Sequence, residues 1–216
     1  MITLNGYNHK YLNSKGEKVP GVTTVLGIVS KPYLIPWANK LGLEGVNLAE
    51  YNKEISGIGS LTHAYIEGFL KDEEVDDSNV AESIKENAKS CFSKFMEWHD
   101  KHDVKPIAME LSLSGERYGG TIDAIMEIDG SVFLMDWKTS REIYEEYWVQ
   151  LSAYLHLLND NRYENEITAV GILQMPKDDS QWKFEIEDGW SRKVDDYYHY
   201  FETCLNLYEA KKLLIR

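Results

Sequence analysis

The sequence is poor in cysteine and has no long apolar run. Its 216 residues include two cysteines, Cys91 and Cys204. Two are too few for a disulfide framework, a cysteine zinc site or a four-cysteine iron–sulfur cluster. No apolar stretch approaches the ~20 residues that a membrane-spanning helix needs. The N-terminus has neither an apolar signal core nor an arginine-rich amphipathic pattern. These absences predict a protein of a reducing, cytoplasmic compartment, with no membrane partner.

Positive charge is also scarce. Lysine and arginine total 23 against 36 acidic residues, which gives a formal net charge of −13. This balance argues against a protein that coats a polyanion through bulk electrostatics. The charge is uneven, however, because residues 1–40 hold five lysines and one acid, Glu17. An acidic protein can still bind a polyanion through such a basic arm, or through metal ions held by carboxylates.

The sequence is rich enough in apolar residues for a folded core. Hydrophobic residues make up 43% and aromatic residues 12% of the chain, and no repeat or linker divides it. Apolar residues spaced three and four apart predict helices, and alternation predicts strands. The predicted helices span 60–70, 82–102, 144–158 and 192–213, and the predicted strands 107–113, 121–128, 132–138, 167–175 and 182–186. This order predicts an α/β or α+β domain with a central mixed β-sheet flanked by helices.

Local signals refine these boundaries. Ser60 is a plausible N-cap for the helix that follows it. A short helix is expected within residues 22–30, and Pro32 and Pro36 then interrupt the chain. Asp129-Gly130 separates two predicted strands and is a strong signal for a tight hairpin.

The strand over residues 132–138 ends in two charged residues. Asp136 and Lys138 are two positions apart, so both side chains point to the same face. A carboxylate and an ammonium group are therefore expected side by side at the end of a strand, where open α/β sheets bind ligands. Two interpretations are open, a structural ion pair and part of a functional site.

Asp123 lies in the strand that the hairpin pairs with this one. It stands between Ile122 and Ala124, and the alternation places it on the opposite face from both. An acid in such a position is unusual unless it faces a cation. Asp123 and Asp136 can share a divalent metal, because hard cations prefer carboxylate oxygen. A strand-edge carboxylate without a ligand is the alternative.

Five further residues are candidates. His63 and Glu67 are four residues apart and share one face of a predicted helix, as do Gln150 and Tyr154. A lone helical histidine is more often a packed or solvated residue than a ligand. Glu110 is an acid near the end of an otherwise apolar strand.

Read in order, these residues form the pattern H-x3-E, E, G-G-x-x-D, D-W-K-T-S and Q-L-S-A-Y. The pattern spans residues 63–154 and resembles the PD-(D/E)XK nuclease superfamily in its RecB-type exonuclease branch. The flanking segments 22–26, 32–37 and 57–70 are similar to phage-encoded relatives and to the mitochondrial genome-maintenance exonuclease. The resemblance implies a restriction-endonuclease-like core and cleavage of DNA with Mg²⁺ or Mn²⁺.

The resemblance also implies roles for individual residues. Asp123 and Asp136 would bind one or two metal ions beside the backbone carbonyl of Trp137, and His63 would be a further ligand. Lys138 would orient or deprotonate the attacking water.

The remaining roles follow from the same resemblance. Gln150 and Tyr154 would position the active site or the DNA. The first acid of the motif is supplied either by Glu110 or by the helix that carries His63 and Glu67. Some relatives hold an iron–sulfur cluster with four cysteines, and this chain does not have them, so no such cluster is implied.

The organisation predicted for the chain is one nuclease domain, residues 1–216. Residues 1–56 form a DNA-binding arm with helices, residues 57–190 the catalytic core, and residues 191–216 a C-terminal helix. The predicted nucleic-acid contacts are Lys31, Tyr33, Trp37, Lys40, Glu67, Thr139 and Ser140. For Tyr33 and Trp37, packing into the core beside two prolines is the alternative.

The predicted function is a metal-dependent DNA exonuclease that prefers single strands or ends, in replication, recombination or repair. Two alternatives are open: an endonuclease of the same fold that acts on structured or duplex DNA, and an inactive fold that only binds DNA.

Overall fold

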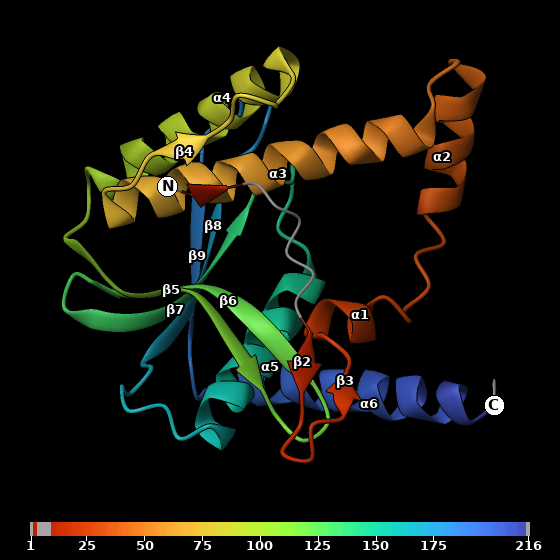
Figure 1. Cartoon of the computed structure of the whole chain (residues 1–216), viewed down its shortest axis with the longest axis vertical. Helices are drawn as coiled ribbons and strands as arrows, with labels where there is room; N and C mark the ends of the chain where they lie inside the picture. Colours follow the sequence, from red (N-terminus) through yellow and green to blue (C-terminus); the bar gives the residue numbers. More distant parts are fainter. Residues whose placement is uncertain (1, 4–9, 215–216) are drawn as a thin grey trace.

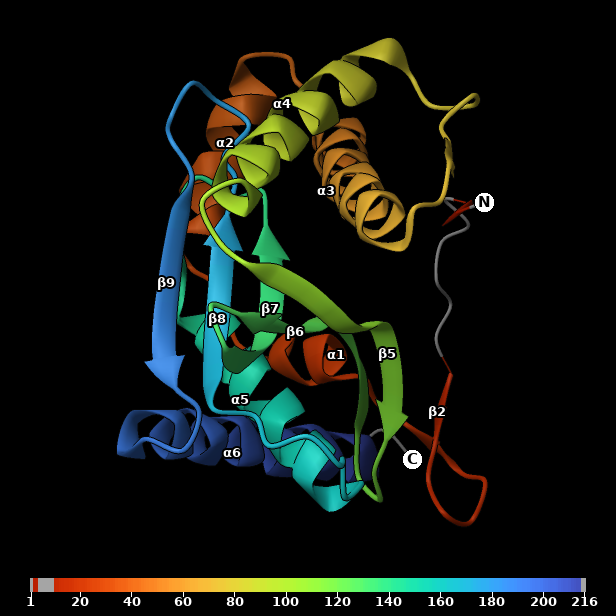
Figure 2. The same cartoon turned by 90° about the vertical axis from the view of Figure 1, so that its left-hand side faces the viewer.

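The computed structural model describes residues 2–3 and 10–214, and its centre is a mixed sheet of five strands in the order β5-β6-β7-β8-β9. The strands are β5 (Val104–Ser114), β6 (Gly119–Ile128), β7 (Ser131–Lys138), β8 (Ala169–Gln174) and β9 (Lys183–Asp188). β5, β6 and β7 are antiparallel neighbours, β8 is parallel to β7, and β9 is antiparallel to β8. Figure 2 shows β7, β8 and β9 side by side. The predicted mixed sheet is confirmed.

The hairpin between β6 and β7 has the predicted turn. Ile128 pairs with Ser131, and Asp129 and Gly130 have φ values of 50° and 85°. Positive φ at both central residues is the requirement of a type I′ turn, which matches the twist of the two strands. The parallel strands β7 and β8 are joined through α5 (Glu145–Asp160), because a parallel pair needs a crossover.

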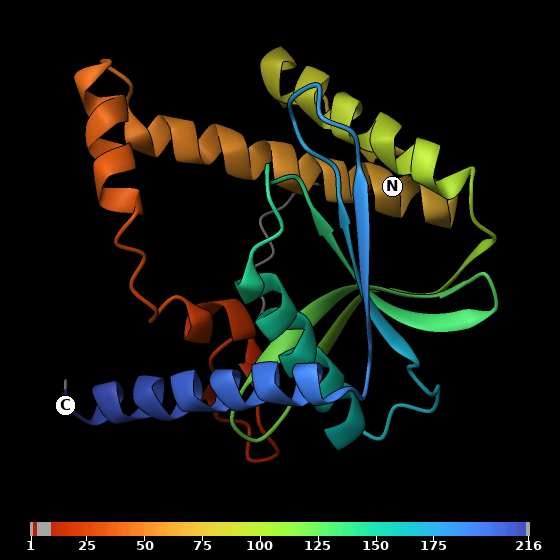
Figure 3. The same ribbon diagram turned by 180° about the vertical axis from the view of Figure 1, so that it is seen from behind.

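Helices cover both faces of the sheet. α3 (Leu48–Lys71) and α4 (Glu82–His99) lie on one side, and α1 (Val22–Leu26), α5 and α6 (Arg192–Leu214) lie on the other (Figures 1 and 3). Two apolar cores result, one on each face. Met126, Met135 and Leu173 belong to the core under α3 and α4, whereas Leu134 and Val170 belong to the core under α5 and α6.

The smaller elements lie around this body. β1 (Ile2–Thr3) pairs with β4 (Val75–Asp76), and β2 (Tyr11–Leu12) pairs with β3 (Lys18–Val19). α2 (Leu34–Leu43) connects α1 on one face with α3 on the other, and it contains no buried residue (Figure 1). Within the described ranges, the helices are too short or too polar to cross a lipid bilayer.

Two helix predictions need correction. α3 begins at Leu48 rather than at residue 60, and Asn47 caps it by accepting bonds from two backbone N–H groups. Gly57 lies inside α3, where its missing side chain leaves room for Ile84 of α4. Pro36 does not interrupt the chain either, since it lies in the first turn of α2, where no backbone N–H donor is needed.

The alternation predicted for β6 is also wrong at one position. Ile122 packs into the core under α5, whereas Ala124 packs into the core under α3. Between them, the paired residues of β5 and β6 skip Asp123 and Glu110. Glu110 has a φ of 51°, a conformation that is uncommon for a residue with a side chain. The strand pair is therefore distorted at these two acids, which breaks the regular alternation.

α5 and α6 pack through a histidine. The His156 ring stacks on Tyr198 with a centroid distance of 3.5 Å and an interplanar angle of 5°. Its Nε2 atom is buried and has no hydrogen-bond partner among the described residues. Burial lowers the pKa of His156 from 6.5, although acids nearby oppose the shift. These acids are Asp195, Asp160 and Glu202.

We expect this histidine to destabilise the fold in acid. Its pKa is lower in the folded chain than in the unfolded chain, so unfolding takes up a proton and stability falls as the pH drops below 6.5. His156→Phe keeps the stacking on Tyr198 and removes the charge. Melting temperatures measured from about pH 8 to about pH 5 should fall less for this variant than for the wild type. His199→Phe, at an exposed position of α6, is the control, and equal slopes for all three proteins would refute the expectation.

Candidate active site

The end of β7 carries a buried ion pair. Asp136 is 1% exposed, and its Oδ2 atom lies 2.5 Å from Nζ of Lys138. Burial raises the pKa of Asp136, and the ammonium group of Lys138 opposes this shift. Burial also favours the neutral amine, but the attraction of Asp136 and Asp123 outweighs it and raises the pKa of Lys138. Lys138 is therefore an ammonium group when only these residues surround it.

α5 supplies an amide that connects the pair to a phenol. Gln150 donates from Nε2 to Asp136 Oδ1 at 3.1 Å and to the Tyr154 hydroxyl at 3.2 Å. Its Oε1 atom accepts from Lys138 Nζ at 3.4 Å. Burial raises the pKa of Tyr154, and the charges of Asp123 and Asp136 add to this shift, so the phenol keeps its proton. The Tyr154 ring lies against Gly120, where a Cβ atom would overlap it.

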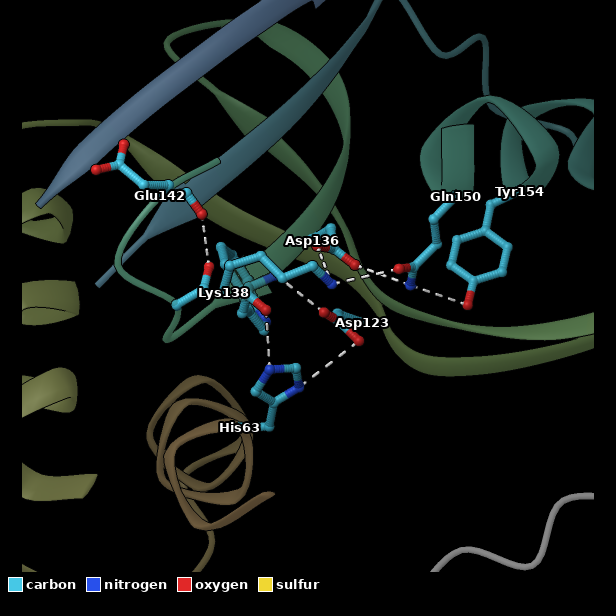
Figure 4. A network of polar contacts seen from close by, with 9 residues as sticks. His63, Asp123, Asp136, Lys138, Glu142, Gln150 and Tyr154 are labelled. Carbon is cyan, nitrogen blue, oxygen red and sulfur yellow. Dashed lines mark hydrogen bonds and ion pairs between the residues drawn. The ribbon is translucent and has the colours of Figure 1, made fainter. Parts of the chain in front are cut away.

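The backbone of Trp137 orients two more candidate ligands (Figure 4). Its N–H donates to Asp123 Oδ2 at 2.9 Å, and its carbonyl accepts from His63 Nε2 at 3.0 Å. Because the carbonyl can only accept, His63 carries a proton on Nε2. In the neutral ring, Nδ1 then has a free lone pair, and it lies 3.6 Å from Asp123 Oδ1.

Glu110 completes a cluster with these two residues. One ligand atom from each of His63, Glu110 and Asp123 lies within 4.8 Å of the other two. Burial raises the pKa of Glu110 to about 8, and the negative charges of Asp123 and Glu67 add to the effect. The strained backbone at Glu110, described above, is typical of positions held for a function.

This donor set fits a divalent cation. The two carboxylates repel each other, and a cation bound between them and His63 would remove this repulsion. A histidine in such a site usually donates its other N–H to a carbonyl or carboxylate, as His63 does to Trp137. Carboxylates suit Mg²⁺ and Mn²⁺, and an imidazole nitrogen favours transition metals. Asp136 lies next to this cluster and adds charge to it.

The structure thus brings together the residues that the sequence pattern singled out as catalytic or metal-binding. His63 comes from α3, Glu110 from β5, and Asp123 from β6, and the others come from β7 and α5. Of the two sources considered for the first acid, Glu110 joins the cluster. Trp137 as a metal ligand stays a prediction, because its carbonyl accepts the His63 hydrogen bond here.

The predicted nucleic-acid contacts near the cluster are less exposed than those in the N-terminal region. Glu67 is 7% exposed and lies 2.5 Å from Lys71 Nζ. The carbonyl of Thr139 accepts from Lys177 at 2.8 Å, and the Ser140 hydroxyl donates to the carbonyl of Glu142. These contacts fix the loop after β7, and their role toward a nucleic acid stays a prediction.

The predicted contacts in the N-terminal region lie on or beside α2. Tyr33 is 60% and Trp37 is 36% exposed, so neither residue fills the core as the alternative required. Trp37 contacts Tyr51 edge-on at 5.8 Å. Lys40 is exposed, and Lys31 forms an ion pair with Glu146 at 2.6 Å.

Tyr147 is a site residue that the sequence pattern did not single out. The Lys138 ammonium group lies 4.6 Å from the centroid of its ring, within the range of a cation–π interaction. The sequence feature that could have identified Tyr147 is its position three residues before Gln150 on the predicted helix, because this spacing places both residues on one face.

Comparison with known proteins adds a family to this geometry. The sequence model of the PD-(D/E)XK nuclease superfamily matches residues 39–206, a range that contains the whole cluster. No curated protein matches the chain significantly. A solved structure titled "Crystal structure of SSO0001" matches with 12% identity over 78% of this chain and 86% of that chain. The TM-score of this match is 0.31.

Glu110 should destabilise the metal-free fold. Its pKa rises from 4.5 to about 8 on folding, so the ionised carboxylate opposes folding increasingly as the pH rises through this range. Glu110→Gln should therefore stabilise the protein in EDTA near pH 8 by on the order of 1–3 kcal/mol, and less near pH 5. Chemical denaturation at both pH values measures this. Glu86→Gln, at an exposed position of α4, is the control, and equal stability of wild type and Glu110→Gln at both pH values would contradict the expectation.

His63 should make the site prefer Mn²⁺ over Mg²⁺. His63→Ala removes the nitrogen ligand, and we expect Mn²⁺ affinity to fall at least ~10-fold while Mg²⁺ affinity changes less. Calorimetric titration with each ion measures both affinities, with His199→Ala as the control. If His63→Ala lowers thermal stability but leaves Mn²⁺ affinity unchanged, His63 is a packing residue.

Proposed function

The chain belongs to the PD-(D/E)XK nuclease superfamily, and we propose that it is a metal-dependent DNA exonuclease that prefers single strands or ends. The observation that carries the proposal is the cluster of His63, Glu110 and Asp123 beside the buried pair of Asp136 and Lys138. Because both acids and the lysine of the superfamily motif are present and in contact range, we do not favour an inactive DNA-binding fold.

We place the chain in the RecB-type branch of the superfamily. The support is a histidine on α3, together with Gln150 and Tyr154 on α5, in the order found in that branch. Cys91 and Cys204 are buried in the cores on opposite faces of the sheet, which agrees with a site that uses metal ions and no iron–sulfur cluster. Free, buried cysteines also agree with a cytoplasmic location.

The residues of the cluster divide the work of phosphodiester hydrolysis. One or two Mg²⁺ or Mn²⁺ ions, when bound, supply the positive charge that activates water and offsets charge on the leaving oxygen. His63, Glu110, Asp123 and Asp136 would hold this charge beside the end of β7. The Trp137 backbone keeps the His63 and Asp123 side chains in place through its two hydrogen bonds.

Lys138 is the group placed to orient the attacking water. Its Nζ atom contacts Asp136 Oδ2 and Gln150 Oε1, and it also lies over the Tyr147 ring. As an ammonium group it donates hydrogen bonds and stabilises negative charge. Tyr154 keeps its proton, and its hydroxyl oxygen accepts a hydrogen bond from Gln150 in the same network.

The N-terminal region is proposed to bind the DNA strand. Residues 1–56 contain the exposed Tyr33 and Trp37, with Lys31 and Lys40 on either side. Aromatic side chains stack on unpaired bases, and an exposed lysine such as Lys40 contacts phosphates, which is the usual combination for single-strand binding. We propose that residues 57–190 are the catalytic core, that 191–216 complete the domain, and that the protein acts in replication, recombination or repair.

The function is tested with end-labelled DNA. Single-stranded and duplex oligonucleotides are incubated with Mg²⁺, Mn²⁺ or EDTA, and we expect stepwise shortening of the single strand only when a metal is present. Circular single-stranded DNA should resist, because an exonuclease needs an end. Cleavage of the circle would identify an endonuclease, and no cleavage of any substrate would refute a nuclease function.

Lys138→Met should remove turnover and spare binding. The variant keeps the length of the side chain but removes the charge, so we expect kcat to fall by about 10²- to 10⁴-fold. The Kd for single-stranded DNA should change only a few-fold. Lys105→Met is the matched control, because Lys105 also pairs with a carboxylate on a strand of the sheet but lies at the surface. Equal losses of affinity and turnover would assign Lys138 to phosphate binding instead.

A further inference from the structure

A pocket lined by aromatic residues lies beside the first turn of α5. It has a volume of about 550 Å³, within the ~300–1,000 Å³ typical of ligand pockets. Its wall includes Leu26, Val29 and Val149 together with Tyr33, Tyr144 and Tyr200. The three tyrosines are 60%, 42% and 48% exposed, so a ligand can reach their rings from solvent.

This pocket adjoins the candidate active site. Tyr144 of its wall contacts Tyr147, with ring centroids 5.5 Å apart. Tyr147 in turn lies under Lys138, whose ammonium group is 4.6 Å from its centroid. Glu146, also in the wall, is one helical turn from Gln150. The pocket and the catalytic lysine are therefore separated by a single aromatic side chain.

The charges of the pocket disfavour a phosphate group. Its lining includes three carboxylates, those of Glu145, Glu146 and Asp196, against one lysine, Lys31. That lysine is paired with Glu146 at 2.6 Å, and Glu145 accepts a hydrogen bond from the Tyr197 hydroxyl. A nucleic acid approaching this wall would therefore keep its backbone outside and insert its uncharged part.

We propose that this pocket binds one unpaired nucleobase of the substrate, from a nucleotide close to the scissile phosphate. The inference rests on the proposed function, because it takes DNA as the substrate. A base inserted between tyrosines and aliphatic side chains gains stacking and apolar contact, as in enzymes that hold a flipped base. A paired base cannot enter, so the pocket would favour single strands and frayed ends over intact duplex.

The test combines a substrate change with a pocket change. Short single-stranded oligonucleotides carry one abasic residue at successive positions, and their Kd values are measured by fluorescence anisotropy in EDTA, where no cleavage occurs. For the wild type, an abasic residue at one position should weaken binding about 5- to 100-fold, the size of one stacking contact. Tyr200→Ala should bind the intact strand correspondingly more weakly and should lose the penalty for that abasic position.

Matched variants control for folding and for surface effects. Tyr200→Phe keeps the ring and should behave as the wild type. Tyr208→Ala removes an aromatic residue from the same helix, outside the pocket lining, and should retain the abasic penalty. Tyr144→Ala is a second pocket variant and should reproduce the result of Tyr200→Ala.

The outcomes separate this proposal from the proposed function. If the wild type cleaves single strands with Mn²⁺ but Tyr200→Ala and Tyr144→Ala keep the abasic penalty, only the base pocket is wrong. The base pocket is also wrong if removal of a terminal phosphate from the oligonucleotide weakens binding as much as the pocket variants do, because the pocket then binds a phosphate. It is equally wrong if the pocket variants bind DNA as tightly as the wild type, because the occupant is then a protein side chain. If the wild type neither binds nor cleaves DNA, both proposals fail.

Discussion

The arrangement of the site depends on where the sheet holds the backbone of Trp137. Its indole ring is buried under α4, edge-on to Phe95 at 5.7 Å, so core packing fixes the residue from one side. Its N–H and carbonyl then orient Asp123 and His63, which come from another strand and from a helix. The neighbouring residues Asp136 and Lys138 point to the opposite side, toward α5. One residue of β7 thus connects the apolar core with two candidate ligands.

The same site is costly for the fold in the absence of a cation. Asp136 is buried with a single ammonium partner, and Glu110 is held with a positive φ beside Asp123 and Glu67. Buried like charges and a strained backbone both oppose folding. Such a cluster is stable only because the surrounding sheet and helices determine its position, and a bound cation would relieve the repulsion. Function and stability therefore make opposite demands on these few residues.

The proposed division of the substrate follows from the distribution of charge around α5. The cluster of His63, Glu110 and Asp123 would accept a phosphate in this proposal, because a bound cation would reverse its local charge. The pocket at the start of α5 is apolar with an acidic lining, so it is suited to the uncharged base. α2, which carries the exposed Trp37, lies on the path of the chain between the two helical layers (Figure 1). Under this proposal, a single strand would expose the bases that these features bind, whereas a duplex would hide them.

The sequence by itself determined the types of the main helices and strands and the hairpin at Asp129-Gly130, because each of these is set by periodicity or by a short motif. It also singled out the residues that the structure brings together at the candidate site, through their ordered pattern. It did not determine the start of α3 or the existence of α2, since Gly57 and Pro36 oppose a helix locally and are tolerated only through packing or position in the first turn. It also left the first acid open, because the choice of Glu110 depends on a distortion between β5 and β6 that no spacing rule predicts. The tautomer of His63, the contact of Tyr147 with Lys138 and the pocket beside α5 were decided by the tertiary structure alone. Each of them joins residues from distant parts of the chain, and only packing brings such residues within contact distance.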